Sequence, residues 1–386
     1  TIKVEKCEGE EERIKFINDQ ILVYKSSLKS DNFDTLLWTK RNFYSTKIPS
    51  SIKTIESHAF TGSNLLYQIT IPSSVTKIGN NAFSYCPKLT KITISSSLIE
   101  IGDDTFNSCS SLEQIIIPSS VTKIGNNAFS NCTKLSKITF STSLIEIGDS
   151  SFKNCSSLTL IALPPSVTKI GNYAFAECIL LQKVILPSIT KIGEGIFLGC
   201  SRLIKDIIIT PIGEGRIKFI DNKILVYKTD PESSNFDTLL WARKDISTVT
   251  IPSSIKTIES NAFFRCSLLT QITIPSSVTE IGNFAFDRCS ALTNITIPSV
   301  IKIGESALAF CSRSIKINIT PINDKKERVK LIDNKILVYK ANPESSDFDT
   351  LLYVGYNFYE KNYVTIPQSI KTIGNYAFYG FSSEIT

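Results

Sequence analysis

Residues 89–111 read LTKITISSSLIEIGDDTFNSCSS, and this 23-residue unit recurs along most of the chain. Its general form is L-x-x-I-x-I-P-S-S-V-x-x-I-G-x-x-A-F-x-x-C-x-x. Self-similarity at a fixed period of roughly 20–50 residues is typical of solenoids, whose units bury their apolar faces by stacking on their neighbours. The recurring aromatic slot holds Phe60, Phe83, Phe106, Phe129, Phe152, Phe175, Phe197, Phe263, Phe286, Leu308 and Phe378.

The first half of the unit predicts a short strand that is buried on one side. In residues 89–94, Leu89, Ile92 and Ile94 point inward, whereas Lys91 and Thr93 point outward. Such period-2 alternation of β-branched residues is typical of a strand. A Pro-Ser-Ser turn follows in many copies, because proline cannot continue a hydrogen-bonded ladder. Successive copies of this strand are expected to pair in parallel.

The second half of the unit contains a V-x-x-I segment, a glycine and the A-F-x-x-C segment. The V-x-x-I segment predicts a second short extended piece. The glycine recurs at one phase, as in Gly79 and Gly102, and indicates a tight corner that needs either positive φ or a close backbone approach. The A-F-x-x-C segment predicts one helical turn. The sequence therefore predicts a β-rich, right-handed solenoid with a parallel sheet on one face and short helical turns on the other.

A longer motif interrupts the rhythm twice and also opens the chain. It reads ILVYK followed by NFDTLL or DFDTLL, and its two apolar strands on either side of a polar loop predict a β-hairpin insertion. We therefore expect a single repeat solenoid over residues 1–386. Its expected segments are hairpin insertions at 1–47, 203–249 and 314–364, repeat blocks at 48–202 and 250–313, and a truncated final repeat at 365–386.

With these residues the chain resembles the BspA-like leucine-rich repeat family. The match extends over nearly every position of repeats such as residues 112–134, and it covers essentially the whole chain. The resemblance implies a leucine-rich repeat solenoid and a cell-surface or secreted location. It also implies binding to a host extracellular or cell-surface protein, and it brings no catalytic residues with it.

Composition and charge exclude several function classes. The 42 basic and 36 acidic residues are interleaved, so no basic run indicates nucleic-acid binding. The sequence contains no stretch of 18 apolar residues, the length that would predict a membrane-spanning helix. The one histidine, His58, occupies a slot that varies widely between repeats, which argues against a catalytic role. We expect no enzyme activity, no cofactor and no metal site.

The cysteines follow most of the recurring phenylalanines by three positions. They contain no C-x-x-C pair, which argues against zinc. Disulfides between adjacent coils stay open as an alternative. Free thiols are favoured, because the same slot also accepts Ser63 and Phe381, as a filler position of the core would. Cys7 lies outside this column, and the sequence does not decide its state.

The outward positions of the first strand predict the binding surface. Most are polar, but Ile116, Leu160, Ala162 and Ile185 place apolar groups on a face that should be solvated, and exposed apolar patches mark partner sites. A plain polar sheet face without a partner site stays open as the other interpretation of these positions. We expect a protein-binding or adhesion module, with a structural spacer or an intracellular interaction scaffold as alternatives. The candidate contact residues are Lys91, Thr93, Gln114, Ile116, Lys137, Thr139, Leu160, Ala162, Lys183 and Ile185.

Overall fold

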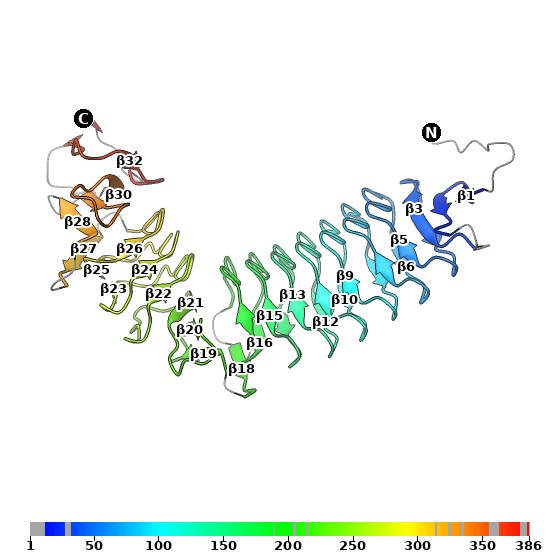
Figure 1. The fold of residues 1–386 in the computed structure, drawn as a ribbon, viewed down its shortest axis with the longest axis horizontal. Coiled ribbons are helices and arrows are strands. Elements are labelled where there is room, and N and C mark those ends of the chain that lie inside the picture. Colours follow the sequence, from blue (N-terminus) through cyan, green and yellow to red (C-terminus); the bar gives the residue numbers. More distant parts are fainter. Residues whose placement is uncertain are drawn as a thin grey trace. The chain divides into compact units, whose positions relative to one another are not determined.

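The computed structural model describes residues 12–27, 32–188, 190–203, 206–213, 215–312, 315–322, 326–332, 336–354, 363–378 and 384–385. The chain forms two compact units, residues 1–215 and 216–386. Each unit is a stack of coils built from short strands and turns (Figure 1). Cys7 and Phe381 lie outside the described residues.

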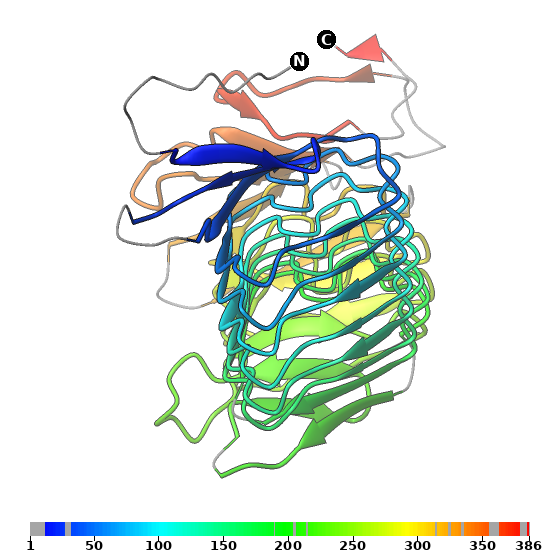
Figure 2. The ribbon, with the colours of Figure 1, turned by 90° about the vertical axis from the view of Figure 1, so that its right-hand side faces the viewer.

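The first unit carries two series of short parallel strands. The L-x-x-I-x-I segments form the first series: β4 (Ser45–Lys47), β6 (Gln68–Thr70), β8 (Lys91–Thr93), β10 (Gln114–Ile116), β12 (Lys137–Thr139), β14 (Leu160–Ala162), β16 (Lys183–Pro187) and β18 (Asp206–Thr210). The V-x-x-I segments form the second: β5 (Thr54–Ile55), β7 (Lys77–Ile78), β9 (Glu100–Ile101), β11 (Lys123–Ile124), β13 (Glu146–Ile147), β15 (Lys169–Ile170) and β17 (Lys191–Ile192). Figure 2 shows the successive turns of this unit lying on one another.

The second unit repeats both series with fewer coils. Its first series is β23 (Gln271–Thr273), β25 (Asn294–Pro298) and β27 (Lys316–Thr320). Its second series is β22 (Thr257–Ile258), β24 (Glu280–Ile281), β26 (Lys302–Ile303) and β32 (Thr372–Ile373). A further parallel pair joins β31 (Tyr363–Val364) to β33 (Glu384–Ile385).

The longer ILVYK motif forms three strands in each of its copies. They are β1 (Ile14–Ile17), β2 (Ile21–Tyr24) and β3 (Thr35–Thr39); β19 (Ile217–Ile220), β20 (Ile224–Tyr227) and β21 (Thr238–Ala242); and β28 (Val329–Ile332), β29 (Ile336–Tyr339) and β30 (Thr350–Val354). The middle strand pairs antiparallel with both neighbours, and the third strand then pairs in parallel with a V-x-x-I strand. The inserted strands are therefore part of the solenoid sheet.

The core of each unit is a set of columns that run from coil to coil. In the first unit the rings from Phe60 to Phe197 stack with centroid separations of 4.6–6.2 Å and interplanar angles of 3–20°. Phe263 and Phe286 stack in the second unit at 4.9 Å. All of these rings are fully buried. Each coil thus completes the burial of its neighbour's apolar face, as repeat architectures require.

The expected helical turn at A-F-x-x-C is wrong, because no helix occurs in the described residues. The segment instead contains two left-handed residues four positions apart, such as Asn81 (φ 59°) and Tyr85 (φ 56°). Its alternate N–H groups donate to the next coil: the Phe83 amide reaches the Thr105 carbonyl at 2.9 Å. One helical turn would leave these N–H groups without partners inside the segment, because the first four N–H groups of an α-helix have none. Coil-to-coil pairing replaces helical pairing here.

The glycine slot is a close approach between backbones. Its glycines lack positive φ, which occurs instead at Gly62, Gly195, Gly199 and Gly213. A Cβ atom on Gly125 would lie 2.7 Å from the Asp103 nitrogen. Where an Asn or Asp follows the glycine, as at Asn80, Asp103 and Asn126, it adds a second link between coils, because its side-chain Oδ1 accepts the backbone N–H of the equivalent residue one coil on. The Asn80 Oδ1 accepts from Asp103 at 3.1 Å, and the Asp103 Oδ1 accepts from Asn126 at 2.7 Å.

The cysteines with described positions are free and buried. Each thiol donates to a main-chain carbonyl of the preceding coil; the Cys132 Sγ, for example, lies 3.2 Å from the Phe106 oxygen. Burial raises the pKa of Cys132 and of Cys266 to about 12. The Cys132 and Cys266 thiols therefore fill the core and stay protonated at neutral pH, where their nucleophilic thiolate is absent.

We expect these thiols to make the protein sensitive to alkali. The folded chain holds the thiol protons more tightly than the unfolded chain, whose cysteine pKa is about 8.5. Stability is therefore complete below that pH and is lost as the pH rises toward 12. Each such thiol should cost about 1.4 kcal/mol per pH unit above the unfolded pKa. Urea unfolding between pH 8 and 11 measures the slope, and Cys132→Ala should flatten it; an unchanged slope would contradict this assignment.

Candidate binding face

The predicted contact residues lie on five strands of the first unit, and all of them face outward. Lys91, Thr93, Gln114, Ile116, Lys137, Thr139, Leu160 and Ala162 are exposed, whereas Lys183 and Ile185 are half-buried. Hydrogen bonding divides them among three sheets: β4–β6–β8, β10–β12 and β14–β16–β18. The structure therefore brings Gln114, Ile116, Lys137 and Thr139 together on the second sheet. Leu160, Ala162, Lys183 and Ile185 lie together on the third sheet.

The third sheet carries the most apolar part of this face. Parallel register aligns Ala162 with Ile185 and Ile185 with Ile208 across β14, β16 and β18. The neighbouring row aligns Leu160 with Lys183 and Lys183 with Asp206. We call residues 160, 162, 183, 185, 206 and 208 the apolar row patch. It combines an apolar row, exposed at Ala162 and Ile208 and half-buried at Ile185, with a cation and a carboxylate on adjacent strands.

The patch includes two residues that the sequence analysis did not select. Asp206 and Ile208 follow Leu203 in the stretch LIKDIIIT, where one extra residue disturbs the L-x-x-I spacing. Ile208 is 44% exposed, close to the 46% of Leu160. The alternation of Ile207 and Ile209 was the available signal, because it predicts a strand whose intermediate residue faces outward.

On the second sheet, Ile116 stands apart as a highly exposed apolar side chain. It is 69% exposed and aligns with Thr139 on β12. Its neighbours in the second row, Gln114 and Lys137, also align with each other. An isolated isoleucine on a polar sheet is a suitable anchor for a partner, since its burial would remove apolar surface from water.

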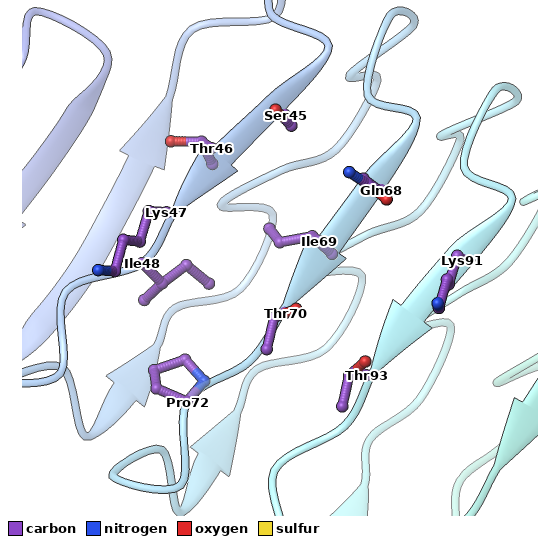
Figure 3. Close-up of a pocket in the computed structure, with 10 residues that line it drawn as sticks. All are labelled: Ser45, Thr46, Lys47, Ile48, Gln68, Ile69, Thr70, Pro72, Lys91 and Thr93. Carbon is purple, nitrogen blue, oxygen red and sulfur yellow. The ribbon is translucent and has the colours of Figure 1, made fainter.

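Lys91 and Thr93 belong to a different feature. They line an open hollow with a volume of about 610 Å³ over β4, β6 and β8. Figure 3 shows Ser45, Gln68 and Lys91 in one row and Lys47, Thr70 and Thr93 in a second row. Ile48 and Pro72 border the hollow at one end. The sequence analysis missed β4, because residues 43–47 lack the leucine that begins the other units.

Within the described ranges, no group of three or more His, Cys, Asp or Glu side chains is placed to hold a metal ion. In the same part of the chain, no helix is long and apolar enough to cross a membrane.

The repeat pattern matches a known family. The model of the BspA type leucine rich repeat region matches residues 34–159, 122–222, 236–337 and 352–386, with six copies. The chain belongs to this family. The resemblance predicted from the sequence is therefore confirmed. Proteins with such repeats are generally non-catalytic.

Solved structures with similar folds are leucine-rich repeat proteins of bacteria. The pneumococcal vaccine antigen PcpA is 20% identical, with a TM-score of 0.55 over 82% of this chain and 83% of that one. A leucine rich cell surface protein from Faecalibacterium prausnitzii is 23% identical, with a TM-score of 0.50 over 81% and 96%. A leucine-rich repeat protein from Eubacterium ventriosum is 26% identical, with a TM-score of 0.50 over 61% of each chain. None of the curated proteins compared with the sequence matches it.

Proposed function

We propose that this chain is a non-catalytic binding or adhesion module of a cell-surface or secreted protein. It would engage a host extracellular or cell-surface protein through the outward face of β10, β12, β14, β16 and β18. The single observation that carries the proposal is the row of Ala162, Ile185 and Ile208, aligned in register on a solvated sheet. Family membership supports it, because leucine-rich repeat proteins present such surfaces to protein partners.

The proposed mechanism is that a rigid sheet face binds its partner through many modest contacts spread over a large area. Every strand of this face is fixed beneath by the buried aromatic and aliphatic columns, so little ordering is required when a partner binds. Leu160 and Ile116 are the exposed anchors, because a partner that covers them removes apolar surface from water. Lys183 and Asp206 would set the orientation of the partner through charge.

The test replaces an anchor with a carboxylate. Leu160→Asp and Ile116→Asp should each weaken attachment to host cells or to an immobilised partner by about tenfold or more, because each places a charge in the buried interface. The matched control is Ile145→Asp. Ile145 is 49% exposed but precedes the second strand of its coil, away from this face.

Attachment of both anchor variants at the wild-type level, with the coils still folded, would contradict the proposal. A loss of equal size in Ile145→Asp would contradict it too, since the effect would then not depend on this face. A module that only separates other domains would give the first of these results.

A further inference from the structure

The hollow over β4–β6–β8 recurs in the second unit at an offset of 203 residues. The second hollow has a volume of about 450 Å³. Its lining includes a pair of residues from each of three successive coils, namely Thr248 and Thr250, Gln271 and Thr273, and Asn294 and Thr296. These positions correspond to Gln68, Thr70, Lys91, Thr93, Ser45 and Lys47 of the first hollow. Both volumes fall within the roughly 300–1,000 Å³ that small-ligand sites occupy.

The two hollows share one chemistry and differ in charge. At each hollow, two outward side chains from each of three adjacent coils form a grid of six lining residues. Hydroxyl and amide side chains fill most positions of both grids, and no carboxylate occurs among the described lining residues of either hollow. The first grid has ammonium groups at two diagonal corners, Lys47 and Lys91. The second grid has Thr250 and Asn294 in their places, and Lys223, which also lines it, donates to the Thr248 carbonyl at 3.0 Å.

We propose that the first hollow is a binding site for an acidic glycan, a sugar chain that carries sulfate or carboxylate groups. Hydroxyl and amide side chains both donate and accept hydrogen bonds, as sugar hydroxyl groups do. The two lysines supply charge-assisted hydrogen bonds to the anionic substituents. This site lies on a different sheet from the apolar row patch and does not depend on the proposed protein-binding function.

A peptide is a poorer occupant of this hollow. The strand at its centre, β6, pairs on one side with β4 and on the other with β8, so its main chain cannot add a strand from a partner. An acidic peptide donates only through its main-chain N–H groups and accepts only through its carbonyls and carboxylates, so none of its groups both donates and accepts as a hydroxyl does. A sugar chain can use both roles.

Two exposed tyrosines stand in the sequence just before two of the strands that line the first hollow, and the second unit has no counterpart of them. Tyr44 and Tyr67 immediately precede β4 and β6, are 68% and 55% exposed, and lie on adjacent coils, where the Tyr67 amide donates to the Tyr44 carbonyl at 2.8 Å. The equivalent residues of the second unit are Ser247 and Thr270. A tyrosine offers an apolar ring face together with a hydroxyl, which suits a ligand with both kinds of surface.

Titration calorimetry of the full chain tests the site. The probes are a sulfated heparin hexasaccharide, a carboxylated galacturonic acid hexamer, a neutral maltohexaose and poly-L-glutamate. We expect at least one acidic sugar to bind with one site per chain, more tightly than maltohexaose and poly-L-glutamate. The double variant Lys47→Gln with Lys91→Gln should weaken that binding at least tenfold. The control Lys77→Gln with Lys123→Gln removes equal charge from the second strand series and should change it less than twofold.

Substitutions in the second hollow should create a second binding site for the same sugar. Thr250→Lys with Asn294→Lys supplies the missing corner charges and should raise the stoichiometry from one to two. A stoichiometry that stays at one would show that the six-residue grid does not define the site. Absence of binding by both acidic sugars, equal binding of poly-L-glutamate, or an equal loss in the charge control would each overturn the proposal. None of these results bears on attachment through Leu160 and Ile116.

Discussion

Replacing Phe129 with alanine is expected to lower the free energy of unfolding by about 3–5 kcal/mol. The ring is fully buried and stacks at 5.2 Å on both Phe106 and Phe152, so its removal leaves a cavity in the middle of the aromatic column. Neighbouring rings cannot close that cavity, because each is held by its own coil. Equilibrium unfolding in urea, followed by circular dichroism, measures the loss.

The chain itself offers the matched control. Leu308 occupies the aromatic slot in one repeat, which shows that a leucine fits the backbone of this coil. Phe129→Leu should therefore cost about 1 kcal/mol, since much of the side-chain volume is kept. If the alanine variant were no less stable than the leucine variant, the aromatic column would not be part of the core.

The second large effect is expected from Gly125→Ala. The added Cβ would lie 2.5 Å from the Asp103 Oδ1, 2.7 Å from the Asp103 nitrogen and 2.7 Å from the Gly102 carbonyl carbon. Two of these atoms belong to the main chain of the preceding coil and cannot rotate away. The coils must separate locally, which should cost about 3 kcal/mol and weaken the hydrogen bond from Asn126 to the Asp103 carboxylate.

Gly62→Ala separates this steric effect from backbone strain. Gly62 has φ of +70°, and nothing lies within 4 Å of an added Cβ. Its substitution should cost only about 1 kcal/mol, the penalty for a left-handed alanine. Urea unfolding of both variants gives the comparison. Equal losses would mean that the recurring glycine serves φ rather than close packing of coils.

The period of the sequence was sufficient to predict the columns of the core. The spacing of the phenylalanines and of the cysteines requires coils of equal length, and equal coils place like side chains beside each other. The outward direction of residues such as Lys91 and Ile116 followed from strand alternation for the same reason. These features depend on local pattern alone, which explains why they could be predicted.

Other features depend on contacts between coils, which one repeat does not reveal. The segment around Phe83 resembles a helical turn in spacing, but its N–H groups bond to the next coil. The choice between the two explanations of the recurring glycine also required the neighbouring backbone. β4 and β18 were missed because their coils depart from the L-x-x-I spacing, so Ser45 and Lys47 of the first hollow and two residues of the apolar row patch were not selected.

A cross-linking experiment tests the stacking of coils most directly. Lys123 and Glu146 are 23 residues apart and are register partners on β11 and β13, whose Cα atoms should lie about 4.8 Å apart. Cysteines at these two positions should form a disulfide on mild oxidation, since this separation suits the bond. Cysteines at positions 123 and 169, two coils apart, should not. Peptide mass spectrometry that found the second link as readily as the first would contradict the parallel stacking of coils on which the fold and both proposed sites depend.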